Sequence, residues 1–207
     1  MDLILDSWNE LNILEYYDFQ KTLISDKKSC EWEQKIINTT LTCYGKTASK
    51  ATLIAKQIKK GNFLEFLDKV KIKTFFDSIV VAYLICEIKD FDLFKSKLKE
   101  YVLTIDNWAS SDKLNFKKKD KEKLYLLSKE FLLNKKPFVR RTGVNIYFEL
   151  IRDEKYLDKT FSILDSLKEE KEYFVNMCAS WLLCECFSKY RDKTLEYFKN
   201  NDTNAFI

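Results

Sequence analysis

Three side chains in two short segments could hold a positively charged guest. Trp108 and Asp112 lie four residues apart in the segment IDNWASSD (105–112), and Trp181 ends the segment YFVNMCASW (173–181). On a helix, residues i and i+4 share a face, so this indole and this carboxylate would lie side by side. Indole faces attract cations, and a carboxylate adds fixed negative charge. A second indole could close such a site.

The same residues allow a structural interpretation. An indole with an aspartate four residues later is often a core side chain beside a surface carboxylate. Trp181 lies in the apolar run CASWLLC, which is typical of a buried helix. Arg140 and Arg141 precede an apolar run and fit a solvated rim. Solvent exposure of Trp108 and Trp181 distinguishes a binding site from a structural role, because two buried indoles would exclude the binding site.

The composition predicts an all-α fold. The 207 residues include 3 Gly and 1 Pro, where average usage would give roughly 14 and 10. Strand-rich folds need turn residues that this chain lacks. Hydrophobic residues make up 46% of the chain, which is ample for a core. We expect one domain spanning residues 1–207.

Several kinds of site are excluded or disfavoured. The chain has no His, which removes His-based triads, His metal ligands and His acid–base catalysis. The six cysteines form no CxxC pair, so we expect reduced thiols, no metal site and no cofactor. The N-terminus has no basic n-region and no apolar stretch is long enough for a membrane span. We therefore expect a cytoplasmic monomer without membrane contact.

Basic charge is concentrated in two windows. Residues 46–60 carry a net charge of +5 and residues 113–141 carry +8, so the rest of this +4 chain carries −9. Such concentration indicates an anionic partner, for example nucleic acid. A solvated helical face with a charged loop is the alternative interpretation.

A repeat marks the C-terminal third. The motif YLDKTF (156–161) recurs as YRDKTL (190–195), an offset of 34 residues, and an apolar helical run precedes each copy, at 142–151 and 178–187. This period and form are typical of HEAT-like repeats, which stack pairs of helices into a solenoid with a concave binding face. We predict a right-handed α-solenoid of roughly a dozen helices. Further helices are expected at 47–60, 62–70, 74–88, 91–104, 107–116 and 122–133.

Local signals place the candidate residues on these helices. Asp106 or Asn107 is a suitable N-cap, which puts Trp108 in the first turn of its helix. Pro137 suits the first turn of another helix. Arg140 and Arg141 would then lie near a helix N-terminus, where phosphate binds well.

Four segments in order give the chain a resemblance to a known family. They are YGKTASKATLIAK (44–56), IDNWASSD (105–112), VRRTGV (139–144) and YFVNMCASW (173–181). In these segments the chain resembles the AlkD-type DNA alkylation repair proteins, which are HEAT-like DNA glycosylases that remove N3- and N7-alkylated purines.

The resemblance implies roles for individual residues. It makes Asp112 the catalytic aspartate, Trp108 and Trp181 the active-site tryptophans, and Arg141 a DNA-backbone arginine. Arg140 and two lysines of the first segment, Lys46 and Lys50, are further candidates for DNA binding. The implied substrate is double-stranded DNA with alkylated bases, and the implied reaction is hydrolysis of the N-glycosidic bond. The alternatives are a non-catalytic HEAT-repeat module that binds DNA or a protein, and a scaffold that binds protein only.

Overall fold

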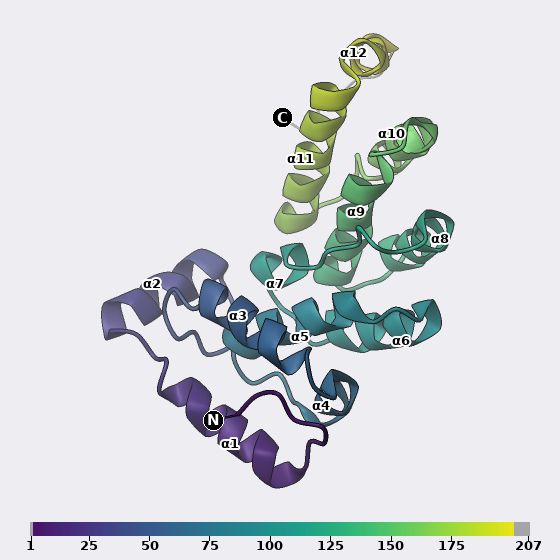
Figure 1. Ribbon diagram of the computed structural model, residues 1–207. Coiled ribbons are helices and arrows are strands. Elements are labelled where there is room, and N and C mark those ends of the chain that lie inside the picture. Colours follow the sequence, from purple (N-terminus) through teal and green to yellow (C-terminus); the bar gives the residue numbers. More distant parts are fainter. Residues whose placement is uncertain (1, 201–207) are drawn as a thin grey trace. The chain divides into compact units, whose positions relative to one another are not determined.

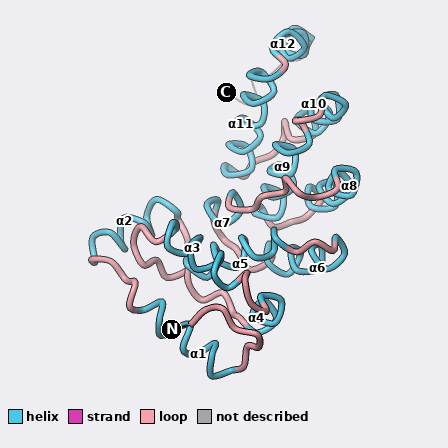
Figure 2. The backbone as a smooth tube through the Cα atoms, viewed as in Figure 1, coloured by secondary structure: helices cyan, strands magenta, loops and turns pink. Residues whose placement is uncertain are grey.

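The chain is built from helices joined by short loops (Figures 1 and 2). A computed structural model describes residues 2–200, and this part contains no strand; an isolated bridge joins Thr42 and Thr74. The α-helices of the described part are α1 (Glu10–Lys21), α2 (Lys27–Ile37), α3 (Ala48–Ile58), α4 (Phe63–Lys69), α5 (Phe75–Glu87), α6 (Phe91–Val102), α7 (Trp108–Asp112), α8 (Lys121–Leu132), α9 (Pro137–Leu150), α10 (Leu157–Ser166), α11 (Tyr173–Lys189) and α12 (Arg191–Asn200). A short 3-10 helix, η1 (Glu154–Tyr156), precedes α10. The all-α, HEAT-like prediction of about a dozen helices is confirmed. No helix in residues 2–200 has the length and apolar character needed to cross a membrane.

Polar side chains set where the helices begin. At seven helix starts, a side-chain oxygen accepts a hydrogen bond from a backbone N–H in the first turn, which satisfies a donor that the helix leaves unpaired. These caps are Asn9, Asp26, Asn62, Thr74, Asp90, Asn107 and Asp120. Pro137 begins α9, as its fixed φ favours.

The chain divides into two compact units, residues 1–115 and 116–207. The expectation of one domain over 1–207 remains a prediction. The first unit holds α1 to α7 around α5, a helix whose residues are buried on nearly every side. The carboxylate of Asp77 in α5 is also buried and accepts hydrogen bonds from Tyr16, Gln20 and Thr74. Burial raises the pKa of Asp77 in spite of these bonds.

The second unit shows the repeat that the sequence predicts. Within it, α8 packs on α9, α9 on α11 and α11 on α12 (Figure 1). Tyr156 and Tyr190 each stand directly before a helix, α10 and α12. The hydroxyl of Thr160 donates to the Tyr156 carbonyl at 2.8 Å, and that of Thr194 donates to the Tyr190 carbonyl at 2.9 Å. The two copies of the motif therefore form the same local structure.

One predicted helix is much shorter than expected. The prediction placed a helix at 107–116, whereas α7 ends at Asp112. Leu114 and Phe116 are buried beyond this end, and the N–H of Asn115 donates to the Cys86 sulfur at 3.1 Å. Tertiary burial of these side chains thus competes with continuation of the helix.

Candidate functional site

Two adjacent residues, Asp106 and Asn107, hold the start of α7 in different ways. The side chain of Asn107 accepts the Ser110 N–H at 2.8 Å and caps the helix. Asp106 turns to the loop after α2 and accepts the N–H and the hydroxyl of Thr40, each at 2.6 Å, together with the Thr39 hydroxyl. Partial burial raises the pKa of Asp106, but hydrogen bonds from Thr39, Thr40 and Asn107 outweigh it, so the pKa falls below its ordinary value. The carboxylate therefore ties the start of α7 to this loop.

A buried network holds the middle of α7. The hydroxyls of Ser110 and Ser78 lie 2.7 Å apart, and both side chains are fully buried. The Tyr101 hydroxyl lies 3.0 Å from the Ser110 carbonyl oxygen and 3.1 Å from that of Ser78. Burial raises the pKa of Tyr101 strongly, so its hydroxyl stays protonated and donates at neutral pH. These contacts connect α7 to α5 and α6.

Trp108 and Asp112 stand at the two ends of α7. The Trp108 indole is half-buried, and its N–H donates to the Ile36 carbonyl at 3.3 Å. Asp112 is exposed, one turn further on. The structure thus places these two residues on one helical turn, as the spacing predicts, and leaves both accessible to solvent.

Arg141 and Trp181 come together on α9 and α11. The guanidinium carbon of Arg141 lies 5.7 Å from the centre of the Trp181 ring, within the range of a cation–π contact. Arg141 is fully buried and donates to the Phe174 carbonyl. Trp181 is 47% exposed, so its interpretation as a core residue is wrong. The solvated-rim interpretation is also wrong for Arg141.

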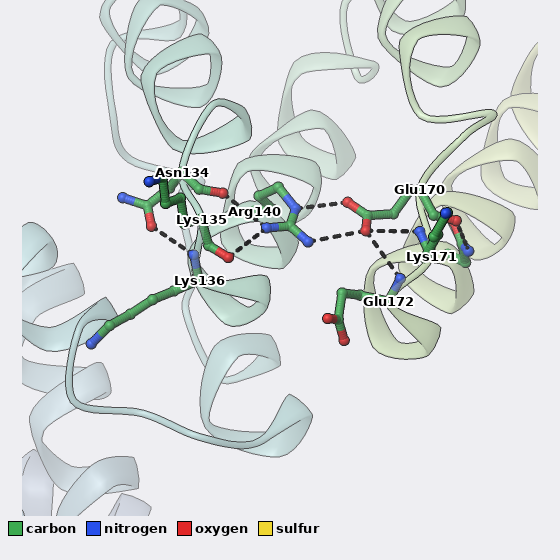
Figure 3. A network of polar contacts seen from close by, with 8 residues as sticks. Asn134, Lys135, Lys136, Arg140, Glu170, Lys171 and Glu172 are labelled. Carbon is green, nitrogen blue, oxygen red and sulfur yellow. Dashed lines mark hydrogen bonds and ion pairs between the residues drawn. The ribbon is translucent and has the colours of Figure 1, made fainter.

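Arg140 takes part in a network inside the second unit, shown in Figure 3. Its Nε and Nη2 donate to the two carboxylate oxygens of Glu170 at 2.7 and 3.0 Å. Its Nη1 donates to the carbonyls of Asn134 and Lys135, both at 2.9 Å. Burial raises the pKa of Glu170, but hydrogen bonds from Arg140 and from two backbone N–H groups have the larger, opposite effect. The pKa of Glu170 therefore lies below its ordinary value. The assignment of Arg140 to DNA binding remains a prediction.

Lys46 and Lys50 are both exposed in the first unit. Lys46 follows Gly45 in a left-handed turn, with φ of 55° and 78° respectively. Lys50 lies in the first turn of α3. The structure therefore leaves both lysines outside the core, in the basic window 46–60.

The described residues offer no cluster of titratable side chains for a metal. Across residues 2–200, no group of three or more Cys, Asp or Glu side chains could hold a metal ion. Four of the six cysteines are buried, Cys30 is half-buried and Cys184 is exposed, and none of the six forms a disulfide.

Sequence reasoning missed the residues that support α7. Tyr101, Ser78 and the Ile36 carbonyl make contacts across 9, 32 and 72 positions of the chain. No local pattern marks such partners. A buried polar residue in an apolar helix, such as Ser78 in α5, is the one available signal, because it needs a hydrogen-bond partner.

Comparison with known proteins gives a family match. The chain matches the family model described as DNA alkylation repair enzyme over residues 22–205. No curated protein and no solved structure matches significantly.

Proposed function

The chain belongs to the DNA alkylation repair enzyme family, and we propose that it is a DNA glycosylase for cationic N3- and N7-alkylated purines. Its substrate is double-stranded DNA, from which it removes the alkylated base by hydrolysis of the N-glycosidic bond. We further propose that it acts in the cytoplasm as a monomer. The observation that carries the proposal is the exposed Asp112 carboxylate one helical turn from the solvent-accessible Trp108 indole.

The chemistry suits these side chains. A 3- or 7-alkylpurine is already cationic, so it leaves without a general acid, and a chain without His can catalyse its loss. As the base departs, positive charge moves onto the deoxyribose in an oxocarbenium-like transition state. A carboxylate such as Asp112 stabilises that charge and orients the attacking water.

The two indoles act on the cationic nucleoside. Trp108 and Trp181 flank it in this proposal, and each cation–π contact contributes about 0.5–2 kcal/mol. One side of the Trp181 ring already faces the Arg141 guanidinium, while nearly half of the side chain is exposed. Arg141 thus orients the Trp181 ring from within the fold. The family resemblance implies a contact of Arg141 with the DNA backbone, and this contact would require the fully buried side chain to become exposed.

DNA binding rests on the exposed lysines. Lys46 and Lys50 have the exposure that phosphate contacts need. Arg140 would add to them only if its ion pair with Glu170 opened, because its guanidinium nitrogens already bind inside the unit.

The direct test measures release of 7-methylguanine and 3-methyladenine from methylated duplex DNA. Asp112→Asn keeps the shape of the side chain and removes its charge, and it should lower the excision rate by roughly 10²–10³-fold, as loss of one electrostatic stabiliser does. Asp92→Asn, an exposed aspartate of α6, is the matched control and should leave the rate unchanged.

Two outcomes would overturn parts of this proposal. Equal excision by wild type and Asp112→Asn would remove the catalytic role of Asp112. Absence of excision by the wild type would favour the alternative, a non-catalytic HEAT-repeat module that binds DNA or a protein partner.

A further inference from the structure

Helix α2 exposes two apolar side chains on one face, and one of them is an indole. Trp32 is 54% exposed and Ile36, one turn later, is 50% exposed. Tryptophan is highly buried on average, so an indole this open to solvent calls for a partner. Neighbouring exposed apolar side chains are typical of interaction surfaces.

The rest of this helix face is basic. Lys28 precedes Trp32 by four residues and Lys35 follows it by three, so both share its face, and both are exposed. The two acidic residues of α2 already have partners, although Glu31 is exposed and lies at helical spacing from Lys28 and Lys35. Glu31 pairs with Lys27 at 3.7 Å, and the buried Glu33 accepts the Gly45 N–H at 2.8 Å. Lys28, Trp32, Lys35 and Ile36, the α2 face, therefore combine positive charge with apolar surface.

The loop before α3 brings another lysine to this helix. Gly45 packs so closely on α2 that a Cβ at this position would lie 3.0 Å from the backbone of Ser29 and Cys30. The Ser25 N–H also donates to the Tyr44 carbonyl at 2.8 Å. Lys46, the next residue after Gly45, is thus adjacent to the first half of α2.

The α2 face continues to the proposed catalytic helix. The Ile36 carbonyl accepts the Trp108 indole N–H at 3.3 Å, so Ile36 and Trp108 are in direct contact. Trp32 lies four residues before Ile36 in α2, which corresponds to about 6 Å along the helix axis at 1.5 Å per residue. This distance spans about two nucleotide steps of ~3.4 Å. A DNA strand that has its alkylated nucleotide at Trp108 and runs along α2 would place neighbouring nucleotides beside Trp32.

We infer that the α2 face is a second contact surface for duplex DNA, next to the alkylated nucleotide. Trp32 and Ile36 contact the minor groove, where DNA-binding proteins commonly place apolar side chains. Lys28 and Lys35 neutralise phosphates on either side. The location beside the lesion rests on the proposed function, whereas DNA contact by Trp32 can be tested without it.

Binding of a fluorescent, undamaged duplex tests this inference by anisotropy over a series of salt concentrations. Trp32→Ala should weaken binding about tenfold, within the range for removal of one aromatic side chain that packs on nucleic acid. The dependence on salt should stay as in the wild type, because the substitution removes no charge. Trp32→Phe should keep most of the affinity. Leu14→Ala, which shortens a side chain of α1 that is 57% exposed, is the matched control and should bind like the wild type.

The lysines give an independent signature. Lys28→Gln and Lys35→Gln should each lower the slope of log affinity against log salt by about 0.9, because each variant neutralises one phosphate fewer. Lys21→Gln, an exposed lysine of α1 that is paired with Asp18, is the control and should leave the slope unchanged.

Three results would overturn the inference. They are unchanged affinity of Trp32→Ala, absence of DNA binding by the wild type, and a wild-type dimer that Trp32→Ala converts to a monomer with unaltered DNA affinity. The last result would make the α2 face an interface between two copies of the chain. Weaker binding by Trp32→Ala together with no excision by the wild type would support the α2 face and remove the glycosylase proposal, so the two failures are distinguishable.

Discussion

The Tyr101 hydroxyl lies 3.0 Å from the carbonyl oxygen of Ser110, in the middle of α7. Helix α7 has five residues, fewer than an isolated helix needs to be stable in water. Its geometry, and with it the placement of Trp108 and Asp112, therefore depends on tertiary contacts such as this one.

Tyr101→Phe should destabilise the first unit by about 1–3 kcal/mol, because it leaves a buried carbonyl without its donor. Urea unfolding followed by circular dichroism measures the change. Tyr83→Phe, a half-buried tyrosine on α5 outside this network, is the control. Equal stability of Tyr101→Phe and the wild type would show that the hydroxyl does not support α7.

Trp108→Ala and Trp181→Ala should each lower excision of 7-methylguanine by about 2- to 30-fold, the effect of removing one cation–π interaction. Both effects should be smaller than that of Asp112→Asn. Trp108→Phe keeps an aromatic face but lacks the N–H that binds the Ile36 carbonyl, so it should lie between Trp108→Ala and the wild type. A decrease in either Ala variant as large as that in Asp112→Asn would contradict the assigned roles.

Lys46→Gln and Lys50→Gln should each reduce the salt dependence of DNA binding by about 0.9 in the log–log slope, one phosphate contact apiece. Non-specific wild-type affinity should be weak, about 10⁻⁴–10⁻⁶ M. Lys21→Gln, an α1 lysine paired with Asp18, is the control and should keep the wild-type slope. Binding that does not respond to salt would argue against phosphate contacts.

Glu170→Gln should make stability less sensitive to acid. The folded pKa of Glu170 is lowered, so its ion pair with Arg140 stabilises the folded state above the unfolded pKa, about 4.3. This contribution disappears as pH falls through the folded pKa. Urea unfolding from neutral pH to pH values below that point should give a flatter profile for Glu170→Gln than for the wild type.

Glu169→Gln, an exposed neighbour of Glu170, serves as the control for this pH profile. Its profile should follow that of the wild type. If Glu170→Gln and Glu169→Gln gave the same profile, the ion pair would not account for the acid sensitivity.

Local patterns in the sequence predicted the all-α class and helices from residue 47 onward, but they did not predict α1 or α2 and made α7 too long. Scarce Gly and Pro, apolar periodicity and side-chain caps act within a few residues. The all-α class, a cap at Asp106 or Asn107, the start of α9 at Pro137 and the 34-residue repeat could therefore be predicted, and the structure shows that Asn107 is the cap. The family could also be recognised from four ordered segments, because the match extends over residues 22–205.

Exposure and partner choice were decided only by tertiary structure. The sequence alone could not show that Trp181 is exposed while Arg141 is buried, since both follow from how α9 packs on α11. Arg140 donates hydrogen bonds to Glu170, which is 30 positions away in the sequence. The Trp108 indole N–H donates to the Ile36 carbonyl, which is 72 positions away. Helical periodicity and capping are set by neighbours in sequence. Burial and long-range hydrogen bonds depend instead on which surfaces meet once the whole unit has packed.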